Sequence, residues 1–242
     1  TYDAVADLQR RVGQALFTQV IDRGLTGMVL DVGCGTGFIT RELMALSEIE
    51  KVIALDIAVP MLQATRQKVN SQKLLLVCAD AEYLPLSEQA VHHIVSNLAL
   101  QWCEDLSSVF SDFKRVLKPN GQLLFSTFGS QTLQELKAAW AKVDDYSHVN
   151  SFYTAAQITQ ALQQAGFNQI QVNEKIYLSQ YESAMALRRE LKAIGAHNVT
   201  SARRKTMTGK KKMQTMIAEY ELLRSNGLIP ATFEIITVMA RV

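Results

Sequence analysis

Glycines and one acid near residue 30 have the types and spacing to bind a ligand through bare backbone. Asp31 lies in an apolar run, and glycines follow at alternate positions, Gly33, Gly35 and Gly37. Glycine adopts positive φ at little cost and leaves no side chain between backbone and ligand, and a helix beginning at this turn offers unpaired N–H groups. The spacing is G-x-G-x-G, which differs from the G-x-G-x-x-G of dinucleotide enzymes.

Two further acids follow the next two predicted strands. Asp56 lies about twenty residues beyond the glycine turn, at the position that holds the ribose hydroxyls in nucleoside-binding α/β folds. Asp80 follows the third strand, in Asp-Ala-Glu. The alternative for Asp56 is an ordinary solvent-exposed residue at the end of a strand.

Alternating strand and helix patterns must position these residues. We expect strands at 28–32, 51–56, 73–79, 91–97 and 122–128, and helices at 7–21, 36–45, 60–69 and 106–117. Residues 73–79 are almost wholly apolar, as in a strand covered on both faces, and 118–121 (Lys-Pro-Asn-Gly) predict a stop and a turn. The β-α alternation predicts a parallel sheet with ligands at the carboxyl ends of its strands.

Composition limits the class of protein. The 242 residues suit one large α/β domain with an insertion, or two small domains. No apolar run approaches the roughly 20 residues of a membrane span, and residues 1–19 lack the pattern of a signal peptide. The three cysteines have no C-x-x-C spacing, so we expect neither disulfides nor a zinc site, a reduced cytoplasmic setting, and a packing role for Cys34.

The positive charge is concentrated in one segment. The chain has a formal net charge of +2, and residues 203–212 carry six cations and no acid, so the remainder has a net charge of −4. This distribution argues against a dedicated nucleic-acid binder and favours a local contact with an anionic partner.

The glycine turn resembles the first motif of the class I S-adenosylmethionine-dependent methyltransferases, D-x-G-x-G-x-G. The resemblance implies that the turn wraps the methionine part of the cofactor and that Asp31 lies near its amino group. It also implies a Rossmann-like α/β fold: a mostly parallel seven-stranded sheet in the order 3-2-1-4-5-7-6, with helices on both faces.

The last two strands and an insertion follow from the same resemblance. Residues 170–179 and 232–241 are the candidates for strands six and seven, of which the seventh is expected to be antiparallel. Helical patterns at 184–194 and 210–225 separate them, which is far longer than a usual hairpin connection. We therefore expect a single methyltransferase domain over 1–242, with a helical insertion at 182–230 beside the active site.

The resemblance assigns further residues to the cofactor. At the adenine end, Asp80 would read the amino group, the Ala81 backbone N–H would contact the ring, and Ile57 and Met61 would flank it, although core packing explains Met61 nearly as well. At the methyl end, the residues next to the sulfonium would be Asn97, Leu98 and Trp102. An aromatic ring attracts a cation, but Trp102 could equally be a packing residue.

Several segments outside the cofactor motifs are similar to the malonyl-acyl carrier protein O-methyltransferases of biotin synthesis. These segments are 96–102, 125–129, 132–140, 148–152, 191–198 and 230–234. The similarity implies methyl transfer from S-adenosylmethionine to the free carboxylate of a malonyl thioester, with S-adenosylhomocysteine as the other product and no metal. This reaction is an early step in making the pimeloyl part of biotin.

The implied acceptor chemistry is simple. A malonyl carboxylate is ionised near neutral pH, so it needs no general base, only alignment with the methyl group and shielding from water. Arginine suits a carboxylate because its planar fork matches two oxygens. Arg189 aligns best with the family's arginine and Arg188 is the second candidate, while the alternative is a solvated helix face.

Other residues take roles only through the resemblance. Tyr2 belongs to an N-terminal segment that would fold over the cofactor, unless that end is frayed, and His148 lies in a motif near the active-site mouth, unless it is structural. Acyl carrier proteins are acidic, and cationic surfaces orient acidic partners. The candidate docking residues, unless they form a solvated loop, are Arg203, Arg204, Lys205, Lys210, Lys211 and Lys212.

Several alternatives remain open on the sequence. One is another methyltransferase of the same fold, acting on a quinone carbon or a different carboxylate. A second is a non-catalytic cofactor-binding module, and a third, a nicotinamide dehydrogenase, is disfavoured by the glycine spacing. We expect no nucleic-acid or membrane partner. The sequence does not determine whether an acyl carrier protein or coenzyme A carries the malonyl group. Nor does it determine how many subunits assemble.

Overall fold

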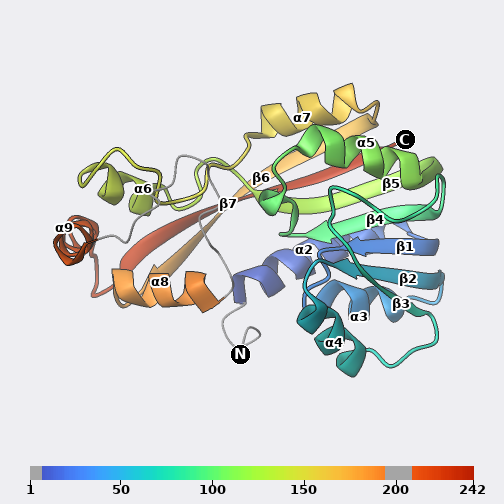
Figure 1. Cartoon of the computed structure of the whole chain (residues 1–242), viewed down its shortest axis with the longest axis horizontal. Coiled ribbons are helices and arrows are strands. Elements are labelled where there is room, and N and C mark those ends of the chain that lie inside the picture. The colour runs from blue at the N-terminus through green and yellow to red at the C-terminus, as the bar shows by residue number, and fades with distance from the viewer. Residues whose placement is uncertain (1–6, 194–208) are drawn as a thin grey trace. The chain divides into compact units, whose positions relative to one another are not determined.

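The computed structural model describes residues 7–193 and 209–242 and divides into two compact units (Figure 1). The larger, which we call the sheet unit, comprises 7–127, 154–174 and 236–242. The smaller, which we call the insertion unit, comprises 128–153 and the described parts of 175–235. The described residues of the expected insertion, 182–193 and 209–230, fall within the smaller unit.

Seven strands form one sheet in the order β3-β2-β1-β4-β5-β7-β6. Their bounds are β1 Gly27–Val32, β2 Ile49–Asp56, β3 Leu74–Cys78, β4 Val91–Asn97, β5 Leu117–Phe128, β6 Asn168–Tyr181 and β7 Ile229–Arg241. The first five pair in parallel. Val242 N donates to Gly121 O and Gly129 N donates to Glu234 O, so β7 runs antiparallel to β5. The predicted strand order is confirmed.

Helices cover both faces of the sheet unit (Figure 1). On one face lie α2 (Asp7–Arg23), α3 (Phe38–Met44) and α4 (Val59–Lys68), and on the other α5 (Leu106–Val116) packs beside α7 (Ala155–Gln164). The apolar residues that recur along α2 at helical spacing are buried and join a core cluster with α3 and the central strands. This burial of one stripe explains why the segment is helical.

Two expectations about the strands are wrong. β3 is an edge strand whose residues Leu75 and Cys78 are exposed, so its apolar composition does not reflect cover on both faces. The second is the start of strand five: α5 ends at Val116, as the proline-glycine stop predicts, but β5 begins at Leu117 rather than at 122. Residues 118–121 are not part of the register with β4, and Asn120 has a positive φ, as in a turn.

The insertion unit contains three helices among its described residues. They are α6 (Gln134–Ala141), α8 (Ala184–Ala193) and α9 (Lys210–Glu221), and α9 contacts both of the others. The sequence patterns predicted α8 and α9 but not α6. Nowhere in 7–193 or 209–242 is a helix long and apolar enough to cross a membrane.

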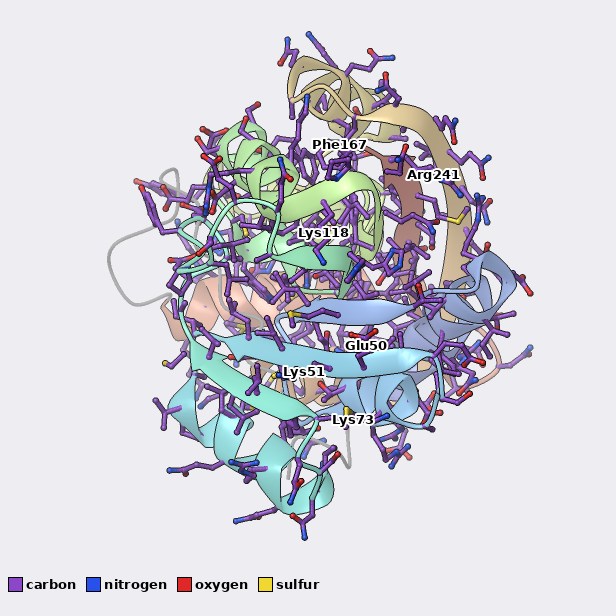
Figure 2. All side chains as sticks on the ribbon, turned by 90° about the vertical axis from the view of Figure 1, so that its right-hand side faces the viewer. Glu50, Lys51, Lys73, Lys118, Phe167 and Arg241 are labelled. Atoms are coloured by element: carbon purple, nitrogen blue, oxygen red, sulfur yellow. The ribbon has the colours of Figure 1, made fainter. Side chains whose placement is uncertain are left out.

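The amino-terminal edge of the sheet carries many charged side chains (Figure 2). Lys51 lies near the start of β2, Lys118 near the start of β5, and Arg241 at the end of the antiparallel β7. The glycine turn and the acids that follow β2 and β3 lie at the opposite, carboxyl edge, where ligands of parallel α/β sheets bind.

Candidate functional site

The turn after β1 requires its glycines. Gly33, Gly35 and Gly37 all have positive φ, between 54° and 82°. A Cβ on Gly33 would lie 2.2 Å from the Ala99 side chain, and one on Gly37 would lie 2.9 Å from Thr65. A Cβ on Gly35 would meet nothing within 4 Å, so this glycine presents bare backbone to open space.

Asp56 holds the glycine turn from the end of β2. Its Oδ2 accepts a hydrogen bond from Gly35 N at 2.9 Å, and its Oδ1 accepts one from Ala58 N at 2.8 Å. Each carboxylate oxygen can accept more than one hydrogen bond, so these contacts leave room for ribose hydroxyls. The structure therefore gives Asp56 a role in shaping the turn that the sequence did not suggest.

Asp31 is a buried acid beneath the same turn. Its side chain is 1% exposed, and Thr40 Oγ1 on α3 donates to its Oδ2 at 2.5 Å. Burial raises its pKa to about 7, and the charge of Asp56 adds to this effect. A ligand ammonium group nearby would favour the ionised carboxylate, which suits the predicted contact with the cofactor's amino group.

Cys34 packs in the turn, as expected. It is 7% exposed, belongs to a core cluster with residues of β2, β3 and α4, and burial raises the pKa of its thiol far above the usual range. A thiol in this state is a poor nucleophile.

The segment after β3 forms a turn capped by Asp80. Its Oδ1 accepts from Glu82 N at 3.0 Å, and its carbonyl accepts from Tyr83 N. Asp80 is exposed at the carboxyl edge of the sheet, followed by the half-buried Ala81. The predicted adenine contacts of both residues stay predictions.

Apolar side chains are exposed around these strand ends. Ile57 follows β2, Tyr83 follows β3, and Trp102 ends the short helix η1 (Leu100–Trp102) after β4. Met61, on α4, is half-buried. Exposed apolar groups beside a binding site are candidates for contact with a ligand. The predicted contacts of Ile57 and Met61 with the adenine and of Trp102 with the sulfonium stay predictions.

Asn97 is bound within the protein at the end of β4. Its Nδ2 donates to Gln9 O on α2 at 3.1 Å, and its Oδ1 accepts from Ser126 Oγ at 2.8 Å. Ser126 also accepts from the backbone N of Leu98, which is buried and has φ 49°. The Asn97 amide thus fixes the strand end, and the predicted contacts of Asn97 and Leu98 with the cofactor stay predictions.

In the insertion unit, His148 lies in a buried network. Its ring stacks on Trp140, with 3.7 Å between centroids and 9° between planes, and its Nε2 lies 2.7 Å from Asp144 Oδ1. Asp144 Oδ2 lies 2.8 Å from Lys212 Nζ on α9. The network engages both His148 and Lys212, two residues for which the sequence suggested contacts with substrate or carrier.

The two candidate arginines on α8 differ in burial and in their contacts. Arg188 is half-buried, with Nη1 at 3.0 Å from Met213 Sδ on α9 and 3.5 Å from Met185 Sδ. Arg189 is exposed and forms no ion pair with a described residue. Tyr2 and residues 203–205 of the candidate docking set lie outside the described residues.

Two carboxylates bind the segment after β5 to β7, and the sequence did not predict these contacts. Glu234 on β7 accepts from Gln131 N at 2.8 Å and from Gln131 Nε2 at 3.0 Å, and Glu135 on α6 accepts from both the backbone N and the hydroxyl of Thr232. Two of the segments noted in the sequence, 132–140 and 230–234, therefore bind each other. The only feature of the sequence that could have indicated this contact is that each segment contains both a threonine and a glutamate.

Similarity to known proteins agrees with this site. Residues 30–125 match the family described as "Methyltransferase domain". The chain is 38% identical over 97% of its length to a malonyl-[acyl-carrier protein] O-methyltransferase of Nitrosospira multiformis, covering 82% of that protein. It is 40% identical over 97% of its length to a biotin biosynthesis bifunctional protein BioHC of Saccharophagus degradans, of which it spans only 43%.

Among solved structures, the YcgJ protein of Bacillus subtilis matches with a TM-score of 0.68 at 13% identity, covering 94% of this chain and 98% of that one. At this identity the likeness concerns the fold alone. The sequence relatives are far closer and span both units. The chain belongs to the malonyl-[acyl-carrier protein] O-methyltransferase family.

Proposed function

We propose that this enzyme transfers the methyl group of S-adenosylmethionine to the free carboxylate of a malonyl thioester carried by an acyl carrier protein, a step of biotin synthesis. The observation that carries the proposal is the extent of the similarity. Relatives with this name match over 97–98% of the chain, including the helices between β6 and β7. A methyltransferase acting on a quinone or another carboxylate would be expected to share the sheet unit, but not the helices between β6 and β7.

The sheet unit would hold the cofactor. The backbone at Gly35, with open space before it, would accept the methionine part, Asp56 the ribose, and Asp80 the adenine. S-adenosylmethionine supplies an electrophilic methyl group when bound. The described residues contain no group of acids, histidines or cysteines that could hold a metal, and the proposed transfer uses none.

The protein's part in the reaction is to bind and orient. An ionised carboxylate attacks a methyl group without losing a proton, so the chain must hold one oxygen in line and exclude water. Arg189 is our first candidate for binding the carboxylate because no described acid neutralises it, whereas Arg188 contacts α9. Alanine at Arg189 should strongly reduce methyl transfer, and near-normal turnover would remove this role.

Carrier docking is proposed at the cations that precede and begin α9. Of the six candidates, Lys212 is bound to Asp144, so Lys210 and Lys211 are the described residues best placed to attract an acidic protein. Charge reversal at these two should raise the KM for malonyl-carrier protein far more than for malonyl-coenzyme A. Equal effects on both substrates would contradict docking.

The reaction itself is tested by mass spectrometry. The protein is incubated with S-adenosylmethionine and malonyl-carrier protein, and a single added methyl is sought on the malonyl carboxyl. Acetyl-carrier protein, which lacks the free carboxylate, is the matched control and should gain none. Absence of both methylated product and S-adenosylhomocysteine would contradict the proposal and favour a non-catalytic module. A lid role for Tyr2 and a reduced cytoplasmic setting stay predictions.

A further inference from the structure

The sequence at the start of α9 does not by itself stabilise a helix end. Its first turn carries Lys210, Lys211 and Lys212 and no acid, and the N-cap residue Gly209 supplies no side-chain hydrogen bond. The helix dipole places partial positive charge at this end, so cations there are destabilising, and an uncapped end leaves N–H groups without partners. The first turn therefore depends on contacts from elsewhere in the insertion unit.

Asp144 supplies such a contact. It lies three residues after α6 ends, its side chain is 9% exposed, and its Oδ2 lies 2.8 Å from Lys212 Nζ. The hydrogen bond from Lys212 lowers the pKa of Asp144 to about 2, and the one from His148 adds to this effect. Asp144 is therefore ionised at neutral pH, and its negative charge offsets that of Lys212, one of the three cations in the first turn of α9.

His148 and Trp140 make the Asp144 side of this contact rigid. Asp144 Oδ1 is held by His148 Nε2, and the His148 ring stacks on Trp140, which is buried on α6. With Lys212 and the backbone N–H of Tyr146, which donates to Oδ1 at 3.2 Å, the carboxylate has three partners. The described contacts run from α6 through Trp140, His148 and Asp144 to α9, consistent with the packing of these two helices (Figure 1).

The opposite end of α9 is held in a different way. Met216 and Tyr220 are fully buried, and the Tyr220 hydroxyl donates to Pro230 O at 2.7 Å. Core packing thus fixes the last turns, whereas the ion pair that the described residues make with the first turn comes from Asp144. The residue after Lys212, Met213, contacts the guanidinium of Arg188 on α8, so displacement of the first turn would reach the helix that carries both candidate arginines.

We propose that Asp144 is a positioning residue: by binding Lys212 and His148 together, it fixes the start of α9 and holds the insertion helices in the arrangement that accepts the malonyl thioester. The identity of the acceptor rests on the proposed function. Lys212 then serves the fold rather than carrier docking, and His148 acts through Asp144 rather than on the substrate.

The test compares Asp144→Asn with Asp145→Asn. Asp145 is the adjacent acid, exposed and without an ion pair to a described residue, so its substitution removes the same charge from the same loop. With malonyl-coenzyme A, D144N should lower kcat/KM about 10-fold, mainly through KM, as expected for loss of one charge-assisted hydrogen bond. D145N should remain within twofold, and both should bind S-adenosylhomocysteine as the wild type does.

Two further measurements separate positioning from a general loss of structure. Hydrogen exchange at residues 213–216, whose backbone N–H groups are the first of α9 to bond within the helix, should quicken in D144N and K212M but not in D145N, while Lys212→Arg should retain slow exchange and turnover. The double variant D144N/K212M should lose no more than D144N alone, because the contact removed by K212M is already lost in D144N.

Other outcomes would overturn the proposal. Exchange and turnover in D144N that match D145N, or fully additive losses in the double variant, would contradict it, as would a loss of cofactor binding in D144N. If the wild type transfers no methyl to a malonyl thioester, the proposed function fails. The exchange measurement would still decide the positioning role, since it needs no acceptor.

Discussion

The sheet unit and the insertion unit use their acids over different distances along the chain. At the cofactor edge, Asp80 binds a backbone N–H two residues away and Asp56 binds one 21 residues away. In the insertion unit, Asp144 and Lys212 are 68 residues apart, and Gln131 and Glu234 are 103 apart. The first site is built by backbone turns, and the second by side chains that connect distant segments.

This difference implies different sensitivities. A site shaped by backbone should fail when a Cβ or a change in φ disturbs the turn, and should tolerate most changes of neighbouring side chains. A site held by ion pairs should respond to single charges and to pH. The following predictions test this contrast, beginning with the largest expected effect.

Gly35→Ala should abolish cofactor binding with little loss of stability. Gly24 is a matched control, since both glycines have positive φ and neither Cβ would meet an atom within 4 Å. Each substitution should cost roughly 1–2 kcal/mol of stability for the left-handed conformation. Calorimetry should show at least 100-fold weaker S-adenosylhomocysteine binding for G35A only. Equal binding by the two variants would remove the glycine turn from the cofactor site.

Asp31→Asn should stabilise the protein at alkaline pH while weakening cofactor binding. The folded pKa, about 7, exceeds the usual value of 3.8, so wild-type stability falls as pH rises from about 4 through about 7. Asparagine removes this penalty, which corresponds to roughly 2–4 kcal/mol at pH 8. Thermal unfolding at pH 5 and pH 8 measures it. A pH-independent difference between the two proteins would contradict the buried-acid explanation.

Ser126→Ala should weaken cofactor binding about 10-fold by releasing the end of β4. The change leaves Asn97 Oδ1 without its hydroxyl donor, at a cost of roughly 1–3 kcal/mol. Ser96→Ala is the control, because the Ser96 hydroxyl is equally buried but donates to Val32 O instead. Comparable cofactor affinities in the two variants would show that the Asn97 contacts do not shape the site.

Acid should loosen the first turn of α9 before it affects the sheet unit. The pKa of Asp144 is lowered to about 2, so the stability it contributes is present above pH 4 and is lost as pH falls from about 4 to about 2. Protection factors, which correct for the change of the intrinsic exchange rate with pH, should fall several-fold at residues 213–216 between pH 5 and pH 2.5. D144N should lack this dependence. An identical pH response in both proteins would contradict the assignment.

The same contrast explains what the sequence could predict. The bounds of β4 and the start of α2 match the predictions, since local apolar patterns decide them. α7 was missed although Thr154 and Gln157 form a capping box, a local signal that was overlooked. β5 begins earlier than predicted because Leu117, before the proline-glycine run, pairs with Val91 of β4, a contact that the local pattern does not encode.

For the site, local motifs indicated the glycine turn and the acids of the cofactor edge. They did not indicate that the Asn97 amide would be engaged by Gln9, 88 residues away. Nor did they indicate Asp144 at all, because its partner Lys212 is distant in sequence. Contacts of this kind depend on tertiary packing, which a periodic pattern does not encode.

The position of Cys34 has a practical consequence. Its buried, protonated thiol lies between two glycines of the turn, whereas Cys78 is exposed at the end of β3. A thiol reagent should therefore label Cys78 at once and Cys34 only when the turn opens to solvent. The ratio of the two labelling rates reports the opening equilibrium of the turn in the unmodified protein, without a fluorophore, an engineered residue or a catalytic assay.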